Sequence, residues 1–232
     1  MNDSGTFSED VALNHDVEAS ENHGSVDVIP DLGSFTGQPL SAAGSTESAQ
    51  IPLEQGSVAP PLTLWQQIRE DWIAHGCDWT KPGFRAVAIQ RFGVWRMMIE
   101  PLFLRAPFSL LYRALYRKAR NTYGIDLPYT VKLGRRVIIE HQSAIIIHGD
   151  AVIGDDCILR QGVTLGNRYL DRPLEAPVLG DRVNVGAGAK ILGKVTIGDD
   201  ANIGANAVVL SDVPAGRSAV GIPAKLLPEK SS

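Results

Sequence analysis

The sequence predicts a mainly β protein, in which a parallel β-helix follows an α-helical segment and a disordered N-terminal tail. Three observations predict this fold: an aliphatic residue at every sixth position, a glycine directly after many of these residues, and an uneven distribution of charge along the 232 residues. The expected boundaries are 1–60 for the acidic tail, 61–123 for the helices, 124–223 for the β-helix and 224–232 for a C-terminal tail.

The six-residue period extends over most of the expected β-helix. An α-helix would space apolar residues three and four apart, and an antiparallel strand would place them at every second residue. In a parallel β-helix each hexad supplies a short strand with an inward aliphatic side chain and a tight turn that favours a small residue. Three hexads form one coil, so the region holds about five coils. The repeat positions are Leu133, Ile139, Ile145, Ile147, Ile153, Leu159, Leu165, Leu179, Val185, Ile191, Ile197, Ile203 and Val209.

The period is interrupted at two places. It shifts by two residues between Ile145 and Ile147, and the step from Leu165 to Leu179 is two residues longer than two hexads. The second interruption predicts a short excursion of the chain after Leu165, because the asparagine, aspartate and proline residues found there are typical of turns.

The segment before the repeat has a helical pattern. Its apolar residues predict helices over 62–76, 84–105 and 108–120, with breaks at Pro101 and Pro107. The sixty residues that follow the tail carry ten Lys or Arg and four Asp or Glu. Two interpretations stay open: a subdomain packed on the β-helix and on a neighbouring subunit, or a basic amphipathic surface that touches anionic lipid at the inner membrane face.

The first sixty residues contain ten Asp or Glu and no Lys or Arg. We expect them to be disordered, because they cannot bury enough apolar surface to offset chain entropy. The start lacks the basic region and apolar core of a signal peptide, and no run of about 18 apolar residues predicts a membrane span. Two distant cysteines, Cys77 and Cys157, predict no disulfide framework. These features favour a soluble, cytoplasmic protein.

The stretch IIEHQSAIIIHGD, residues 138–150, carries His141 and His148 within an otherwise apolar ladder. A buried imidazole without a partner costs about 1–3 kcal/mol, so each histidine is either satisfied in a packed corner or placed for chemistry. A metal-dependent lyase would need a cluster of imidazole ligands, but beyond the tail the only other histidine, His75, belongs to the helical segment. We expect no metal ion and no nucleic-acid partner.

Several segments together resemble one family, the serine acetyltransferases among the hexapeptide-repeat acyltransferases, and the related O-acetyltransferases of exopolysaccharides. The resemblance implies a left-handed β-helix, acetyl-CoA as co-substrate, and a homotrimer or dimer of trimers with sites between subunits. The segments are IRED with PGFRAV (82–87), GID…LGRRVIIEH (124–141), GDAVIGDDCILRQGVTLGN (149–167), GAGAKILG (186–193) and VGIPAKL (220–226).

The resemblance also implies the catalytic roles. In that family a histidine that follows an acidic residue is the general base, and an aspartate fifteen residues earlier assists it; His141 and Asp126 occupy these positions. The spacing is close to one coil and returns the chain to the same side. An aspartate on one ring nitrogen would fix the imidazole tautomer, while the other nitrogen takes a proton from the acceptor hydroxyl.

Three positions depart from the family pattern. Glu140 stands where the family has aspartate, and Glu175 and Ala176 stand where its loop has an Arg-His pair that holds the amino acid. His148 has no counterpart, and we interpret it as a corner residue or as part of the acceptor site with Glu140 and Glu175. Without charged partners for a carboxylate and an ammonium group, such a site favours a neutral acceptor.

The predicted function is therefore acetyl transfer to a hydroxyl of a cell-surface or exopolysaccharide sugar. Two alternatives remain: serine O-acetyltransferase of cysteine biosynthesis, and a catalytically silent β-helix scaffold. Cys157 occupies a corner position that favours a small residue, which argues against an acyl-carrying nucleophile. Coenzyme A would lie in the groove between neighbouring β-helices, with backbone groups on the pantetheine arm and lysines near the phosphates. The candidate residues are Gly186, Ala187, Gly188, Ala189, Lys190, Gly204, Ala205 and Lys225.

Overall fold

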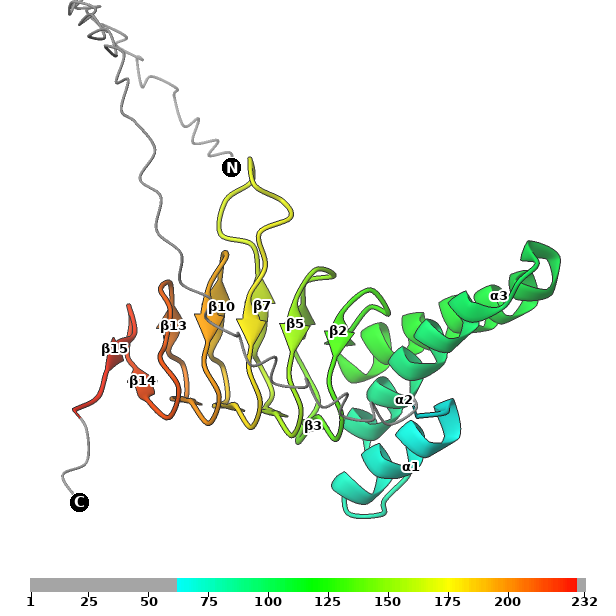
Figure 1. Cartoon of the computed structure of the whole chain (residues 1–232), viewed down its shortest axis with the longest axis horizontal. Coiled ribbons are helices and arrows are strands. Elements are labelled where there is room, and N and C mark those ends of the chain that lie inside the picture. Colours follow the sequence, from blue (N-terminus) through cyan, green and yellow to red (C-terminus); the bar gives the residue numbers. More distant parts are fainter. Residues whose placement is uncertain (1–61, 229–232) are drawn as a thin grey trace, which may run out of the picture. The chain divides into compact units, whose positions relative to one another are not determined.

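The computed structural model describes residues 62–228 of the chain. The expected disorder of residues 1–60 lies outside this part. The described chain begins with a helical segment and continues as a stack of short strands (Figure 1). The helices are α1 (Leu64–Ala74), α2 (Pro82–Trp95), a 3-10 turn (Arg96–Met98), α3 (Leu102–Lys118) and a π turn (Ala119–Tyr123). None of the helices in residues 62–228 is long and apolar enough to span a bilayer.

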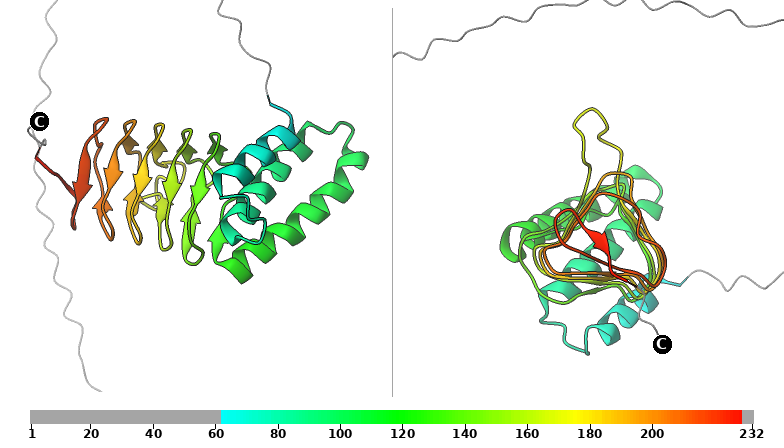
Figure 2. Two further views of the ribbon diagram at one scale, coloured as in Figure 1. Left: turned by 90° about the horizontal axis from the view of Figure 1, so that it is seen from below. Right: turned by 90° about the vertical axis from the view of Figure 1, so that its left-hand side faces the viewer.

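The strands form three sheets, one on each face of a triangular prism, and every strand pair is parallel except β14 with β15 (Figure 2). Sheet A runs β1-β4-β7-β10-β13, sheet B runs β2-β5-β8-β11, and sheet C runs β3-β6-β9-β12-β14-β15. The strands are β1 (Ile125–Asp126), β2 (Lys132–Leu133), β3 (Ile138–Ile139), β4 (Ile145–Ile147), β5 (Val152–Ile153), β6 (Ile158–Leu159), β7 (Thr164–Gly166), β8 (Val178–Leu179), β9 (Asn184–Val185), β10 (Lys190–Leu192), β11 (Thr196–Ile197), β12 (Asn202–Ile203), β13 (Val208–Val209), β14 (Ser218–Val220) and β15 (Lys225–Leu226).

The hexad aliphatics fill the centre of the prism. On sheet A, for example, Ile147, Leu165 and Ile191 are 2%, 0% and 0% exposed and stack in register through paired strands. Burying a side chain of this size contributes about 1.5–3 kcal/mol, so the repeat accounts for most of the core. The prediction of a parallel β-helix is confirmed.

Three edges join the three faces, and each edge carries its own set of corner residues. The CA edge, from sheet C to sheet A, contains 140–144, 160–163, 186–189 and 204–207. The AB edge, from sheet A to sheet B, contains 148–151, 167–177 and 193–195. The BC edge contains 134–137, 154–157, 180–183 and 198–201.

The coils differ in length, and the differences explain both irregularities of the repeat. Corresponding residues of the first two coils, such as Arg136 and Asp156, are 20 residues apart, whereas Arg182 and Asp200 are 18 apart. The two extra residues lie at the CA edge between Ile139 and Ile146, which pair with Leu159 and Thr164 of the next coil. The step of 26 residues between the second and third coils reflects the excursion at 167–177, which stands out from the prism in Figure 2.

The prolines act differently from the prediction. Pro101 precedes the first residue of α3, as expected, but Pro107 lies inside α3 and does not end it. Pro107 lacks the N–H that would bond to the carbonyl of Phe103. Because Pro107 and Phe103 are both exposed, water can satisfy that carbonyl, and packing of the opposite helix face keeps the helix continuous.

The helical segment packs on the first coil through buried polar contacts. His75, 3% exposed, donates from Nδ1 to the carbonyl of Asp71 at 2.7 Å and accepts at Nε2 from the N–H of Ile139 at 3.2 Å. Burial lowers the pKa of His75, so the ring is neutral with its proton on Nδ1. Arg91 pairs with Asp71 at 2.9 Å and also donates to the carbonyl oxygens of Leu133 and Gly134.

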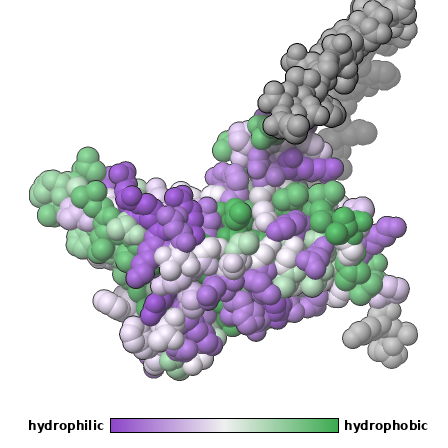
Figure 3. Space-filling model, turned by 180° about the vertical axis from the view of Figure 1, so that it is seen from behind, coloured by the Kyte–Doolittle hydropathy of each residue, from purple (hydrophilic) through white to green (hydrophobic). Residues whose placement is uncertain are grey.

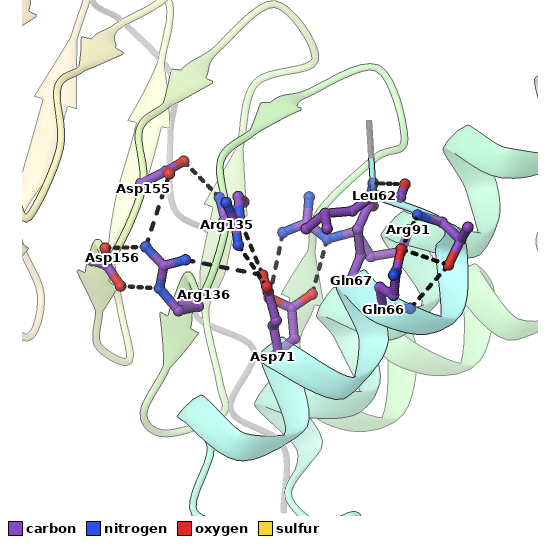
Figure 4. A network of polar contacts seen from close by, with 11 residues as sticks. Leu62, Gln66, Gln67, Asp71, Arg91, Arg135, Arg136, Asp155 and Asp156 are labelled. Carbon is purple, nitrogen blue, oxygen red and sulfur yellow. Dashed lines mark hydrogen bonds and ion pairs between the residues drawn. The ribbon is translucent and has the colours of Figure 1, made fainter. Parts of the chain in front are cut away.

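Charged residues extend this contact along the BC edge (Figure 4). Arg135 pairs with Glu70 of α1 at 2.5 Å, and this hydrogen bond holds the pKa of Glu70 below its ordinary value. Arg136 pairs with Asp156 of the next coil at 2.5 Å and lowers the pKa of that carboxyl group in the same way. The helices are therefore fixed to the first two coils at one edge.

The expected C-terminal tail, residues 224–232, contains a further strand. β15 extends sheet C to Leu226 beyond the hexad repeats. β15 pairs antiparallel with β14, with Val220 opposite Lys225. The chain reverses after Gly221, whose φ of 95° suits a glycine. The hexad period carries no information about this reversal.

Candidate active site

His141 lies exposed at the CA edge, two residues after β3. It belongs to the enlarged corner, which is held by backbone bonds from Ser143 to Tyr123 (2.9 Å) and from Ile145 to Gly124 (3.0 Å). Within residues 62–228 the structure records no hydrogen bond to the imidazole ring, so both ring nitrogens can face a ligand. The corner thus presents an accessible imidazole on a fixed backbone.

Asp126 ends β1 and lies beside the same corner, because β1 pairs with β4. Its Oδ1 accepts a hydrogen bond from the phenolic hydroxyl of Tyr116 on α3. Burial and the Asp126 charge raise the pKa of Tyr116, so the phenol remains a donor at neutral pH. In the described chain no hydrogen bond joins Asp126 to His141. The two predicted catalytic residues therefore adjoin one corner without direct contact.

Glu140, next to His141, is held by the following coil. Its carboxylate pairs with Arg160 at 2.7 Å, and Arg160 also donates to the side chain of Asn184 at 2.5 Å. The ion pair partly neutralises Glu140 beside the candidate base. Arg160 was not among the predicted site residues, although its position one coil after Glu140 could have indicated the contact.

His148 lies at a different edge from His141. It follows β4 at the AB edge, where its Nδ1 accepts from the N–H of Asp150 at 3.2 Å and lies 3.6 Å from that carboxylate. These contacts are typical of a turn residue. Strand β4 lies between the two histidines, which places them at the two opposite edges of sheet A.

The excursion loop, residues 167–177, also belongs to the AB edge. Glu175 lies 3.6 Å from Arg172, and the side chain of Ala176 is buried in the core. The guanidinium groups of Arg168 and Arg172 lie 5.1 and 5.3 Å from the ring centre of Tyr169. Glu175 therefore has a cationic neighbour in its own loop. Within one chain, Glu175 and His148 lie on the AB edge, whereas Glu140 and His141 lie on the CA edge.

The predicted cofactor turns share the CA edge with His141. Backbone bonds run along this edge from Gly162 to Ser143, from Gly188 to Gln161 and from Asn206 to Ala187, each 2.8–2.9 Å. The coils approach closely here, since a Cβ on Gly186 would lie 2.6 Å from the nitrogen of Ala205. These glycines are thus required for coil stacking, and they leave a smooth, backbone-rich edge beside the candidate base.

The two candidate lysines differ in their surroundings. Lys190 donates to the carbonyl of Gly162 at 2.5 Å and to Thr164 Oγ1 at 3.0 Å, so its ammonium group is engaged within the β-helix. Lys225 is exposed on β15, at the C-terminal end of the stack. Only Lys225 presents an uncommitted charge for a phosphate.

Cys157 is packed at the BC edge. Its side chain is 0% exposed, and burial raises the pKa of the thiol to about 11. A protonated, inaccessible thiol is a poor nucleophile. Across residues 62–228 no group of three or more His, Cys, Asp or Glu side chains is arranged to hold a metal ion.

The sequence matches one family model and several serine acetyltransferases. The family model "Bacterial transferase hexapeptide (six repeats)" matches residues 176–211. Serine acetyltransferase of Helicobacter pylori is 47% identical over 120 residues, which cover 52% of this chain and 70% of that protein. Serine acetyltransferase of Synechocystis sp. is 41% identical over 146 residues, which cover 63% of this chain and 56% of that protein.

Solved structures of serine acetyltransferases are also similar to this chain. Soybean serine acetyltransferase complexed with serine has a TM-score of 0.61 and 31% identity, covering 71% of this chain and 69% of that chain. Serine acetyltransferase of Neisseria gonorrhoeae has a TM-score of 0.61 and 30% identity, covering 71% of this chain and 66% of that chain.

Fold and site together define an acyltransferase with a left-handed parallel β-helix of hexapeptide repeats. Within that class, the chain belongs to the serine acetyltransferase family. It spans little more than half the length of the Synechocystis relative.

Proposed function

We propose that the chain transfers an acetyl group from acetyl-CoA to the hydroxyl group of L-serine. The carrying observation is the exposed His141 on a glycine-rich edge, in a chain 47% identical over 120 residues to a serine acetyltransferase. The saccharide acceptor favoured by the sequence departures becomes the second candidate.

In the proposed reaction, His141 takes the proton of the acceptor hydroxyl as its oxygen attacks the thioester carbonyl carbon. The tetrahedral intermediate then collapses, the carbon–sulfur bond breaks, and the imidazolium returns the proton to the leaving thiolate. General-base assistance of this kind contributes roughly 10²–10⁴-fold to the rate. Acetyl-CoA is consumed as a co-substrate, so the chemistry requires no resident cofactor group.

Asp126 serves as a positioning residue in this proposal. Tyr116 occupies Oδ1 of Asp126, which leaves Oδ2 for a ring nitrogen of His141. We propose that the exposed imidazole turns toward β1 to form that bond. The carboxylate would then fix the tautomer and stabilise the imidazolium that forms during transfer.

Coenzyme A is proposed to lie along the CA edge, past Gly186–Ala189 and Gly204–Ala205. The small residues at Gly186–Ala189 and Gly204–Ala205 leave backbone groups accessible on this part of the edge, which allows an extended pantetheine arm to contact them. The thioester would thereby reach the corner that holds His141.

The proposed site lies between copies of the chain. His141 and Glu140 are on the CA edge, whereas Glu175 and its loop are on the AB edge. A β-helix prism cannot bring two of its own edges together. A homotrimer, alone or paired with a second trimer, brings the CA edge of one copy to the AB edge of the next.

Arg168 and Arg172 support an amino-acid acceptor. The loop lacks a cation at Glu175 and Ala176, but these two arginines lie beside Tyr169 in the same loop. A guanidinium can bind the serine carboxylate by two hydrogen bonds. The saccharide alternative is supported by Glu175, because its negative charge in this loop would repel a substrate carboxylate.

The test is release of free coenzyme A thiol from acetyl-CoA with L-serine, compared with oligosaccharides and nucleotide sugars. We expect turnover with L-serine and a KM in the ordinary range for enzymes, about 1 μM–1 mM. Turnover with a saccharide alone would overturn the serine acceptor and retain acetyl transfer. An absence of transfer to every acceptor would contradict both.

A further inference from the structure

An exposed apolar face lies at the helical end of the described chain (Figure 3). Met98, Leu102, Phe103 and Leu110 are 66–75% exposed, and Leu111 is 50% exposed. They come from one continuous stretch that joins the 3-10 turn to α3. We call residues 97–111 the apolar tip. So many large apolar side chains on one surface mark an interaction site rather than scattered exposure.

The charge next to the apolar tip has one sign. Residues 101–123 contain five Lys or Arg and no Asp or Glu. Arg113, Arg117 and Lys118 are exposed on α3, and no ion pair within residues 62–228 engages them. A partner that is both apolar and anionic would match this face.

A groove between α3 and the first coil continues the same chemistry. Arg96, Arg105 and Arg113 line it together with tyrosines, and no acidic residue contributes to its lining. Arg96 is 7% exposed, lies between the rings of Tyr112 and Tyr129 at 4.4 and 4.5 Å, and its buried Nε has no partner among the described residues. Because its lining has three arginines and no acidic residue, the groove suits an anionic group.

We propose that the apolar tip and its arginines dock on the surface of an anionic lipid bilayer. The apolar side chains would enter the boundary between head groups and acyl chains, while the cations meet lipid phosphates. A second copy of the chain fits this face poorly, because two such faces would bring like charges together without a counter-charge. The inference does not depend on the identity of the acceptor.

The experiment is co-sedimentation of the full chain with vesicles. We expect binding to phosphatidylcholine vesicles that contain about 30% phosphatidylglycerol to be at least about tenfold tighter than binding to phosphatidylcholine alone. Salt at about 0.5 M should remove most of that difference by screening. Inorganic phosphate at equal ionic strength should displace no more protein than chloride, since the bilayer is the proposed ligand.

Two double variants with matched controls separate the apolar and electrostatic contributions. Phe103→Ser with Leu110→Ser, and Arg113→Glu with Arg117→Glu, should each weaken binding to the anionic vesicles at least about tenfold. Leu170→Ser, at an apolar side chain 96% exposed, and Lys132→Glu with Lys194→Glu, at exposed lysines of the β-helix, should change it less than about twofold.

Equal binding to both vesicle types, or binding to neither, would overturn the proposal. It would also be overturned if the tip variants kept vesicle binding but lowered the mass of the assembly in light scattering, which would assign the face to a second copy. Thermal melting of each variant checks that the exposed substitutions leave the fold intact.

Discussion

The phenolic hydroxyl of Tyr116, on α3, donates a hydrogen bond to Oδ1 of Asp126, on β1. This bond connects the helical segment directly to the candidate orienting residue of the β-helix. The helices therefore do more than cover the first coil. They fix the carboxylate that the proposed mechanism places behind His141.

Replacing Tyr116 with phenylalanine should lower kcat. A hydrogen bond to a charged group contributes about 1.5–3 kcal/mol, so loss of a part of this positioning predicts a kcat about 3- to 30-fold lower, with the KM for acetyl-CoA unchanged. Steady-state kinetics measure this split. Tyr112→Phe is the matched control: Tyr112 lies on the same helix as Tyr116, but its hydroxyl accepts from the N–H of Tyr129 and makes no hydrogen bond to Asp126 in the described chain. Equal losses of kcat in both variants would reduce Tyr116 to a structural role.

Substitution of His141 by alanine should lower transfer by roughly 10²–10⁴-fold without affecting thermal melting, because the side chain is exposed and acts as the base. His148→Ala, at the AB edge, should lower the rate by less than about threefold and reduce stability slightly through loss of its turn contact. Thiol release at saturating acetyl-CoA measures both. If His141→Ala retains more than about a tenth of the wild-type rate, another group is the base.

Mixed assemblies test whether the site lies between copies. Neither His141→Ala nor a variant that lacks residues 168–175 should be active alone. Random co-assembly of the two in a trimer gives about a quarter of interfaces an intact His141 from one copy and an intact loop from the next, so activity should recover to about that level. Denaturation and co-refolding of the two variants, followed by light scattering and the thiol assay, provides the measurement. A mixture as inactive as its components would place both elements in one chain.

The buried pair of Asp71 and Arg91 should be important for stability. Asp71→Asn leaves the Arg91 guanidinium buried without its counter-charge, and breaking such a pair costs about 3–5 kcal/mol. Urea unfolding should show this loss in the free energy of unfolding. Arg182→Met, at the exposed pair with Asp200 on the BC edge, should leave the midpoint nearly unchanged. Similar effects of both substitutions would mean that Asp71 is not isolated from solvent.

Stability should fall in acid through His75. Burial lowers its pKa below the ordinary value of 6.5; the backbone hydrogen bond and the charge of Asp71 raise it less, and the charge of Lys81 lowers it slightly. Below pH 6.5 the unfolded chain therefore binds a proton that the folded chain does not, and the free energy of unfolding decreases until the pH reaches the lowered value. His75→Gln retains a donor and an acceptor but does not titrate. Urea unfolding of both proteins from pH 8 to pH 5 should show their stability difference shrinking with acid; parallel curves would contradict the neutral assignment.

The β-helix could be predicted from the sequence because its signal is local. A hexad places Ile153 or Leu159 in the core whatever the rest of the chain does, and both are buried as expected. The edges could have been predicted too, since His141 follows a strand of sheet C and His148 follows the next strand, of sheet A. Counting hexads from Ile139 would have separated the two histidines.

Other features depend on contacts between distant segments. The bonds of Arg91 to Leu133 and of Tyr116 to Asp126 join helices to coils, and no spacing rule relates them. The prediction ended a helix at Pro107, because local propensity does not account for the packing that keeps α3 continuous through this proline. In the excursion loop, the residue types at Glu175 and Ala176 indicated a missing cation, but not the guanidinium of Arg172 that lies 3.6 Å from Glu175.

The antiparallel pairing of β15 with β14 has a consequence for the exposed end of the stack. A solenoid that ends on an unpaired parallel strand offers a template to the first coil of another molecule, and chains could then polymerise end to end. Lys225 and Leu226 cover this edge of sheet C with a strand of opposite direction. The helical segment covers the first coil at the other end through His75 and Arg91. In the described chain, sheet C therefore ends on a strand that does not match the parallel first coil of another molecule, which disfavours end-to-end growth of that sheet.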